Sequence, residues 1–304
     1  MPNLFKYCLL SCCVTLAACG GGEAPVTVDP DTSDETPSGN TGSVIPSTGE
    51  GNGGNVTPPV SSGVALPDGL QNLRTFADGQ QMVRFYNPQT DEIFVGLTGG
   101  NSLLSELENN TLTNFQNVSL SIEGDRFEAE RTAQTSTNET IDLVISGLNL
   151  TSGGEEYVAR VFMTSPSEGT AYVVAGAPVQ QLQNASATYA GVAEIVVSNT
   201  ATGAQLREVG NFDLSLDFSQ SAPIGRISGA TDGYIFVGAS VALDKETTAL
   251  SSSSVEIGPV MGATQTATLA GNIMGTTGSG VGGIIVSDDT GGAAYLASFY
   301  GTLQ

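Results

Sequence analysis

The chain has 304 residues, with 9 Lys and Arg against 31 Asp and Glu and no His, which gives a formal net charge of −22. This acidic balance disfavours binding to nucleic acid or to an anionic membrane surface, because both are negatively charged. The absence of His removes the commonest metal ligand and the usual acid–base group near neutral pH, and it excludes catalytic triads built on His.

Residues 1–18 are predicted to be a secretion leader that is removed. Lys6 carries the only positive charge, and the apolar run over 8–18 is too short to span a bilayer, for which a helix needs about 20 residues. The motif Leu-Ala-Ala-Cys ends at Cys19 and resembles the lipobox of bacterial lipoproteins. Cys19 is therefore the predicted lipidation site, and acyl chains on it would anchor the mature chain firmly.

The residue after Cys19 predicts the destination. Gly20 stands where lipoproteins of the inner membrane commonly carry Asp, so we expect the outer membrane, with the chain exposed at the cell surface. All 4 Cys lie in the leader or at its end, which leaves no thiol for catalysis and no disulfide in the exported part. Its stability must then come from its core alone.

Residues 19–63 are predicted to be a disordered tether. The segment is rich in Gly, Pro, Ser, Thr and acidic residues, and it contains no aromatic residue and no cation. As a flexible coil it would reach roughly 35–40 Å. Its acidic cluster, Asp29 to Glu35, lacks the Gly and the bidentate Glu that a calcium loop requires at the matching positions, which favours a solvated linker.

Residues 64–180 are predicted to form an N-terminal antiparallel β-sheet region. Short β-rich runs separated by Gly, Asn, Asp and Ser predict strands at 81–86, 92–97, 117–122, 126–133, 140–146, 156–163 and 170–175. Residues 87–91 are a predicted hairpin loop. The only predicted helices lie at 101–110, where Leu103, Leu104 and Leu107 share a face, and at 178–184.

Residues 181–304 are predicted to form a small antiparallel β-barrel. A second series of runs predicts strands at 187–197, 208–218, 224–228, 234–238, 266–274, 281–286 and 293–300. In the run 211–218, apolar Phe212, Leu214, Leu216 and Phe218 alternate with polar residues, as in a half-buried strand. Glycines in or beside these runs (Gly191, Gly225, Gly271, Gly275) permit the tight curvature and close backbone approach that barrel closure requires.

Six segments follow one another in this second half: 188–194 (TYAGVAE), 212–218 (FDLSLDF), 224–229 (IGRISG), 267–275 (ATLAGNIMG), 281–284 (VGGI) and 299–301 (FYG). Their order resembles that in the C-terminal barrel of the transferrin-binding protein B family. Members are surface lipoproteins with a tether, a sheet called the handle, and a barrel of about eight strands. The resemblance therefore implies an all-β chain with one handle and one barrel.

The chain departs from the family pattern in length and in detail. Two-lobed members are about twice as long, so this chain supplies a single lobe. Ile273 and Ile284 replace the usual aromatic residues, and the segment 279–283 lacks the usual acidic residue before Gly-Gly. A single-lobed relative is not assumed to bind transferrin, because such lobes bind other targets as well.

Motifs for catalysis and cofactor binding are weak. The Gly residues at 278, 280 and 283 match G-x-G-x-x-G, but β-branched residues follow and no helix fits there, so we expect a hairpin turn rather than a nucleotide site. Asp288 and Asp289 are interpreted as a hairpin tip rather than calcium ligands. A Ser–Lys pair using Lys245 and a carboxylate pair remain formally open. We predict no catalytic residue, no metal site and no cofactor.

Other charged and aromatic residues have simpler interpretations. Arg126, Glu128 and Glu130, with Arg131 beside them, are predicted to form a charged solvent face. Phe85, Tyr86 and Phe94 are predicted core or handle residues. Tyr157, Phe162 and Tyr172 are either core residues or exposed anchors for a partner, and the sequence leaves this open.

The expected function is that of a non-catalytic binding module anchored in the outer membrane. The resemblance implies capture of a protein ligand in iron or haem acquisition or in host interaction, or assistance to an outer-membrane receptor or translocator, with no nucleic-acid partner. A structural or adhesive envelope lipoprotein is an alternative. A carbohydrate-binding or carbohydrate-acting β protein is a third, although the chain has no Trp to serve as a sugar platform.

Overall fold

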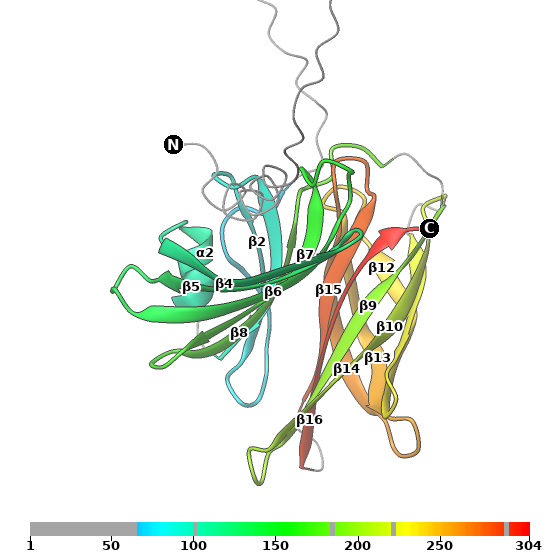
Figure 1. Ribbon diagram of the computed structural model, residues 1–304. Coiled ribbons are helices and arrows are strands. Elements are labelled where there is room, and N and C mark those ends of the chain that lie inside the picture. The colour runs from blue at the N-terminus through cyan, green and yellow to red at the C-terminus, as the bar shows by residue number, and fades with distance from the viewer. Residues whose placement is uncertain (1–65, 100–101, 183–185, 220–222, 289–291) are drawn as a thin grey trace, which may run out of the picture.

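Two antiparallel β bodies, each of eight strands, make up the computed structural model (Figure 1). The structure describes residues 66–99, 102–182, 186–219, 223–288 and 292–304. The predicted leader, Cys19 and tether lie outside these residues. The predicted all-β fold, with a sheet region followed by a small barrel of about eight strands, is confirmed.

The first body is an open sheet with the strand order β1-β2-β3-β8-β7-β6-β5-β4. Its strands are β1 (Gln71–Thr75), β2 (Gln81–Asn87), β3 (Glu92–Thr98), β4 (Thr113–Glu123), β5 (Arg126–Gln134), β6 (Thr140–Asn149), β7 (Tyr157–Ser165) and β8 (Gly169–Gly176). The predicted hairpin loop at 87–91 is confirmed, since Asn87 pairs with Glu92 across it. The Asn87 side chain accepts the amide hydrogens of Gln89 and Thr90, which fixes the turn.

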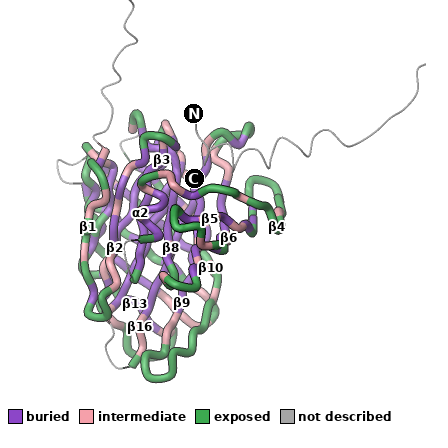
Figure 2. The backbone as a smooth tube through the Cα atoms, turned by 90° about the vertical axis from the view of Figure 1, so that its left-hand side faces the viewer, coloured by how far each residue is buried: buried purple, intermediate pink, exposed green. Residues whose placement is uncertain are grey.

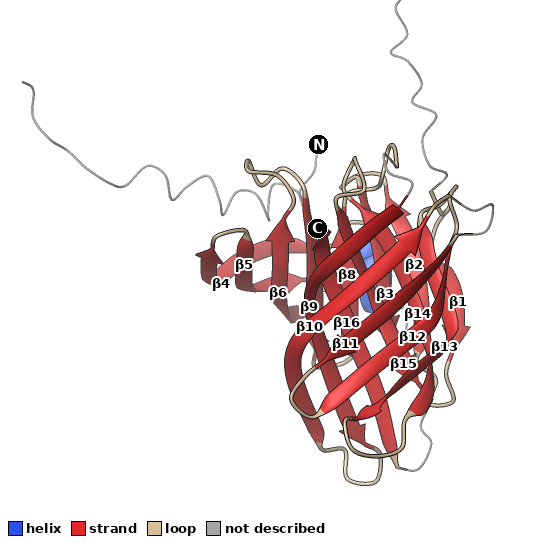
Figure 3. Ribbon diagram, turned by 90° about the vertical axis from the view of Figure 1, so that its right-hand side faces the viewer, coloured by secondary structure: helices blue, strands red, loops and turns tan. Residues whose placement is uncertain are grey.

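One face of the sheet packs against the helix α2 (Ser102–Glu108), which confirms the predicted helix at 101–110. Leu103, Leu104 and Leu107 are buried as expected, and they pack in one cluster with Phe85 and Phe94. The two phenylalanine rings stack with centroids 4.8 Å apart. Figure 3 shows the helix on the side of the sheet that faces away from the barrel.

The second body is a closed barrel in the order β10-β11-β12-β13-β14-β15-β16-β9. Its strands are β9 (Ser186–Asn199), β10 (Gln205–Asp217), β11 (Ile224–Ala230), β12 (Tyr234–Leu243), β13 (Ala249–Pro259), β14 (Gln265–Met274), β15 (Gly280–Ser287) and β16 (Ala293–Leu303). The alternation predicted for 211–218 is confirmed, because Phe212, Leu214, Leu216 and Phe218 are all in the interior cluster.

Glycines close the barrel where the sequence predicted it. Gly191 on β9 pairs with Gly301 on β16, at the seam between the first and last strands. A Cβ atom on Gly191 would lie 2.3 Å from the Tyr300 carbonyl oxygen, and one on Gly301 would lie 2.3 Å from that of Ala190. Only glycine allows these backbones to approach so closely.

A third apolar cluster joins the two bodies. Figure 2 shows that much of the backbone of β3 and β8 in the sheet is buried. The sheet supplies Met82, Ile93, Val95 and Val174, and the barrel supplies residues such as Ile284, Leu296 and Tyr300. Strand β15 is buried along its whole length, because one face lines the barrel interior and the other meets the sheet. A Cβ on Gly282 would lie 2.3 Å from a methyl carbon of Val174, so glycine here permits the contact between sheet and barrel.

The loops gather at two ends of the barrel. At the linker end, defined by residues 177–182, 275–279 and 303–304, the Gln180 amide donates to Thr276 and the Leu303 amide donates to Ser279. At the far end, defined by loops 200–204, 231–233 and 260–264, the Val260 amide donates to Gly233. The β1–β2 hairpin lies near the far end, since it lines a pocket with Thr200 and Gln205.

Three sequence expectations are wrong in detail. Strands β1 and β13 were not predicted. The part of 178–184 that the structure describes is not helical. Arg131 is 4% exposed rather than part of the charged solvent face, because it shares the inward side of β5 with Ala129 and Ala133; Arg126, Glu128 and Glu130 are exposed as predicted.

Candidate functional site

Opposite charges meet across the junction between the sheet and the barrel. Arg74 on β1 lies 2.5 Å from Asp288 at the end of β15, and Arg160 on β7 forms an ion pair with Glu194 on β9. Burial lowers the pKa of a third sheet arginine, Arg84 on β2, and the negative charge of Asp244 after β12 partly opposes this. In each case the sheet supplies the cation and the barrel supplies the carboxylate, so the charges favour one orientation of the two bodies.

The Arg160–Glu194 pair is the most buried of these contacts, with both side chains 4% exposed. Arg160 also donates to the Ser146 hydroxyl at 3.0 Å. Arg207 on β10 approaches the same Glu194 oxygen to 2.5 Å and is 54% exposed, so it covers the pair on the solvent side. The Glu194 carboxylate therefore lies between two guanidinium groups, one from the sheet and one from the barrel.

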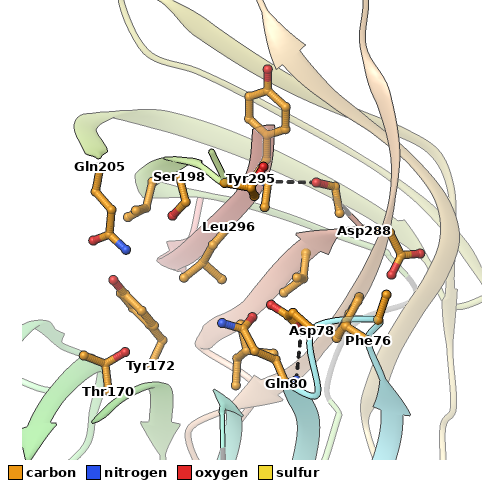
Figure 4. Close-up of a pocket in the computed structure, with 17 residues that line it drawn as sticks. Phe76, Asp78, Gln80, Thr170, Tyr172, Ser198, Gln205, Asp288, Tyr295 and Leu296 are labelled. Atoms are coloured by element: carbon orange, nitrogen blue, oxygen red, sulfur yellow. Dashed lines mark hydrogen bonds between the residues drawn. The ribbon is translucent and has the colours of Figure 1, made fainter. Parts of the chain in front are cut away.

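A small pocket of about 140 Å³ opens between the β1–β2 hairpin and the barrel (Figure 4). Tyr172 on β8 and Gln205 on β10 extend into it from opposite sides, and Leu296 forms part of its wall. Arg74 lies over the Phe76 ring with its guanidinium carbon 4.7 Å from the ring centre, beside the rim residue Asp288. The pocket is too small for a drug-sized ligand, for which at least about 300 Å³ is usual.

The structure places the aromatic residues whose role the sequence left open. Tyr157 is 3% exposed and packs edge-on against Phe127, so it is a core residue. Phe162 and Tyr172 are half-buried and lie 4.8 Å apart between ring centroids, beside the junction. Burial raises the pKa of the Tyr172 hydroxyl, which keeps it a neutral hydrogen-bonding group.

The glycine motif at 278–283 has a packing role. Gly278 has a φ of 74° in the turn after β14, and its carbonyl accepts the Tyr189 hydroxyl at 2.8 Å. The later motif glycines lie on β15, where Gly280 approaches Leu150 of the sheet and Gly283 approaches Phe299 of the barrel; Gly282 between them approaches Val174 of the sheet. The expected turn is therefore confirmed at Gly278, and residues 280–283 belong to strand β15, which packs between the sheet and the barrel interior.

The side chains that the sequence left open for catalysis or metal binding make other contacts in the structure. The Lys245 ammonium donates to the Phe218 carbonyl oxygen at 2.6 Å. Asp288 is in the ion pair with Arg74, and Asp289 lies outside the described residues. Within the described residues, no group of three or more Asp, Glu, His or Cys side chains is placed to hold a metal ion.

The described part of the chain also has no helix with the length and apolarity to cross a bilayer.

The sequence analysis did not predict ion pairs between the sheet and the barrel, although the sequence contains a pattern that indicates one of them. Arg160 interrupts the apolar run Tyr-Val-Ala-Arg-Val-Phe, and Glu194 interrupts Val-Ala-Glu-Ile-Val. A lone charge inside an apolar strand costs free energy unless it is paired, so two such charges of opposite sign indicate a buried ion pair.

Large apolar side chains are exposed toward the far end of the barrel. Met261 is 94% exposed at the tip of the β13–β14 loop, and the adjacent Val260 is 49% exposed. Leu206 and Val209 on β10 are also exposed, at 49% and 60%. Side chains of this kind supply contact area in protein interfaces.

No protein-family model matches the chain, and no curated protein matches it. Among solved structures, intact transferrin-binding protein B with its N and C lobes is similar to this chain, with 11% sequence identity and a TM-score of 0.42. The similarity covers 73% of this chain and 54% of the chain of that protein. A transferrin-binding protein B double mutant from Haemophilus parasuis matches 74% and 53%, with 12% identity and a TM-score of 0.40. The isotype 1 protein from serogroup B Neisseria meningitidis matches 74% and 66%, with 12% identity and a TM-score of 0.36. This chain thus spans about half the length of the first two proteins.

Proposed function

We propose that this chain is a lipoprotein of the outer membrane, anchored through Cys19, that presents a non-catalytic binding surface to a protein ligand. One observation carries the proposal: an eight-stranded sheet is followed by a closed eight-stranded barrel, in the order that the sequence resemblance predicted. The lipobox and the Gly-, Pro- and Ser-rich segment 19–63 precede them in the sequence, which suits display on a long tether.

The direction of the chain supports binding at the far end. Strand β1 runs from Gln71 to Thr75 toward the hairpin that lies beside Thr200 and Gln205. The chain therefore enters β1 from the linker end of the barrel. A tether attached at that end would leave the far-end loops pointing away from the membrane anchor. Those loops carry the exposed Val260 and Met261.

The proposed ligand is a protein because the far end carries exposed apolar side chains of the kind that supply contact area in protein interfaces. Exposed Leu206, Val209, Val260 and Met261 would become buried on contact. Burial of apolar area contributes about 25 cal/mol per Å², which is the main favourable contribution in protein association. Capture of a protein for iron or haem acquisition, or for host interaction, is the role that the family resemblance suggests.

Protease treatment of intact cells tests the proposed display. In cells that express the full chain, we expect added protease to remove the protein while a periplasmic marker survives. A Cys19→Ser variant should lose its association with the membrane fraction. Protection of the chain until the outer membrane is permeabilised would contradict surface display.

Site-specific photo-crosslinking tests for the protein ligand. A photoreactive phenylalanine analogue at position 261 should give a discrete adduct on intact cells grown with host fluid. The same analogue at position 246, in the β12–β13 loop at the linker end, is the matched control and should give none. Absence of an adduct at both positions would contradict the far-end surface and favour a structural envelope role.

A further inference from the structure

A second, larger hollow lies where the sheet and the barrel diverge on the β1 side. It has a volume of about 610 Å³, with β1 and β2 on one side and β12, β13 and β14 on the other. Its lining is part apolar, from Leu73, Met82 and Leu250. The polar lining is one guanidinium, one carboxylate and a set of hydroxyls, from Arg84, Asp244, Ser240, Ser251, Ser252, Ser253, Ser254 and Thr268.

Arg84 differs from the other sheet arginines at the junction. Arg74 and Arg160 each have a carboxylate in an ion pair, at Asp288 and Glu194. The buried Nε atoms of Arg84 and Arg160 both lack a hydrogen-bond partner in the part of the chain that the structure describes, but Arg160 is compensated by its ion pair with Glu194. Burial lowers the pKa of the Arg84 guanidinium, and Asp244 only partly opposes this. A half-buried cation with an unused donor costs free energy that an anionic ligand would recover.

Asp244 is a poor substitute for such a ligand, because its carboxylate already serves the turn after β12. It accepts the amide hydrogens of Glu246 at 2.8 Å and of Thr247 at 3.3 Å. These bonds hold the carboxylate on its own loop.

The serines reach the groove through an irregularity in β13. Pairing with β14 shifts register between Ser252 and Val255, and the Ser254 amide donates to the Ser252 hydroxyl. Pairing with β12 resumes only at Ser251, opposite Ala242. Such bulges redirect side chains and are common beside binding sites. The four serines at 251–254 line the same groove as Arg84.

We propose that this groove binds an oxyanion group, a carboxylate or a phosphate, on the Arg84 guanidinium and the hydroxyls of residues 251–254. The guanidinium offers a planar fork of donors that matches both groups, and hydroxyls complete the shell. The exposed Leu73 side chain also lines the groove and offers apolar contact to the part of the ligand that carries the anion. The proposal does not depend on the lipid anchor or on the far-end surface.

Calorimetric titration of the full chain in detergent tests the site with two probes, sodium citrate for carboxylates and sodium phosphate. Sodium chloride at equal ionic strength is the reference. We expect saturable binding of one probe, and the responding probe identifies the oxyanion. Arg84→Ala should weaken binding at least about tenfold, since a charge-assisted hydrogen bond contributes about 1.5–3 kcal/mol.

Two variants make the assignment specific. Arg126→Ala removes an exposed cation from β5 and should leave binding unchanged. Asp244→Asn keeps an oxygen acceptor for the turn but removes the competing charge, so binding should tighten by about threefold. The proposal is overturned if neither probe binds saturably below about 10 mM. It is equally overturned if Arg84→Ala, checked to be folded, binds as the wild type does, or if Asp244→Asn leaves binding unchanged.

Discussion

Arg160 and Glu194 form an ion pair between the sheet and the barrel in which both side chains are only 4% exposed. Each body contributes one charge that would be unfavourable if it were buried alone. The pair therefore couples the two bodies: if they separated or rotated, two buried charges would lose their partners. An apolar cluster that includes Val174 and Leu296 packs between the two bodies, and the ion pair favours one orientation of them.

Replacing Glu194 with Gln should destabilise the protein by about 3–5 kcal/mol, because Arg160 would remain buried without a counter-charge. Urea unfolding followed by circular dichroism measures the change. Asp288→Asn is the matched control, since its pair with Arg74 is 36% and 39% exposed and should contribute less than about 1 kcal/mol. Equal losses in the two variants would contradict a dominant role for the buried pair.

Gly191→Ala should disrupt the barrel seam. The added Cβ would meet the Tyr300 carbonyl oxygen at 2.3 Å, and backbone on both strands would have to shift. We expect a loss of at least about 2 kcal/mol, measured by thermal unfolding. Gly99→Ala, which places its Cβ in open space, should be close to neutral. A seam that tolerates alanine at 191 would show that the strands are less closely packed than described.

The stability of the helix-covered face should depend on pH through Glu106. Burial alone would raise the pKa of this carboxyl, but hydrogen bonds from Ser136 and Thr111 outweigh it and lower the pKa overall. A lowered folded-state pKa means that the stabilisation is present above the ordinary value near 4.5 and is lost as the pH falls through the folded-state value.

Unfolding of Glu106→Gln and wild type should therefore be compared between about pH 3 and pH 7. We expect the variant to be less stable near neutral pH, with a difference that shrinks toward acid. Glu108→Gln, on the same helix, should show a smaller difference at every pH. A gap between wild type and Glu106→Gln that stays constant with pH would refute the ionised role of Glu106.

Much of the fold could be predicted because its sequence signals are local. The alternation over 211–218 follows directly from one strand having one buried face. The helix α2 could be predicted because Leu103, Leu104 and Leu107 share one face. Gly191 at the barrel seam could be predicted as a position of close backbone approach, whereas the role of Gly301 and its pairing with Gly191 could not.

The rest could not be predicted because it depends on contacts between distant segments. The run of serines in β13 is typical of a loop, and only pairing with β12 and β14 makes it a strand. Strand β1 is short and mostly polar, and it exists because β2 offers a free edge. Arg160 and Glu194 are recognisable from the sequence as lone charges inside apolar strands, but which residue each one contacts depends on how the sheet meets the barrel, and the same holds for Arg84. The division of the chain into units at 64–180 and 181–304 stays a prediction.

The anchor is the premise of the proposed function, and the mass of the mature amino terminus tests it most directly. The full chain should be expressed in a Gram-negative host, extracted from the outer membrane and measured intact and after digestion. The account predicts a chain that begins at Cys19 and carries the mass of a diacylglyceryl group and an amide-linked acyl chain. An unmodified Cys19, in a chain released to the medium or still carrying residues 1–18, would contradict it.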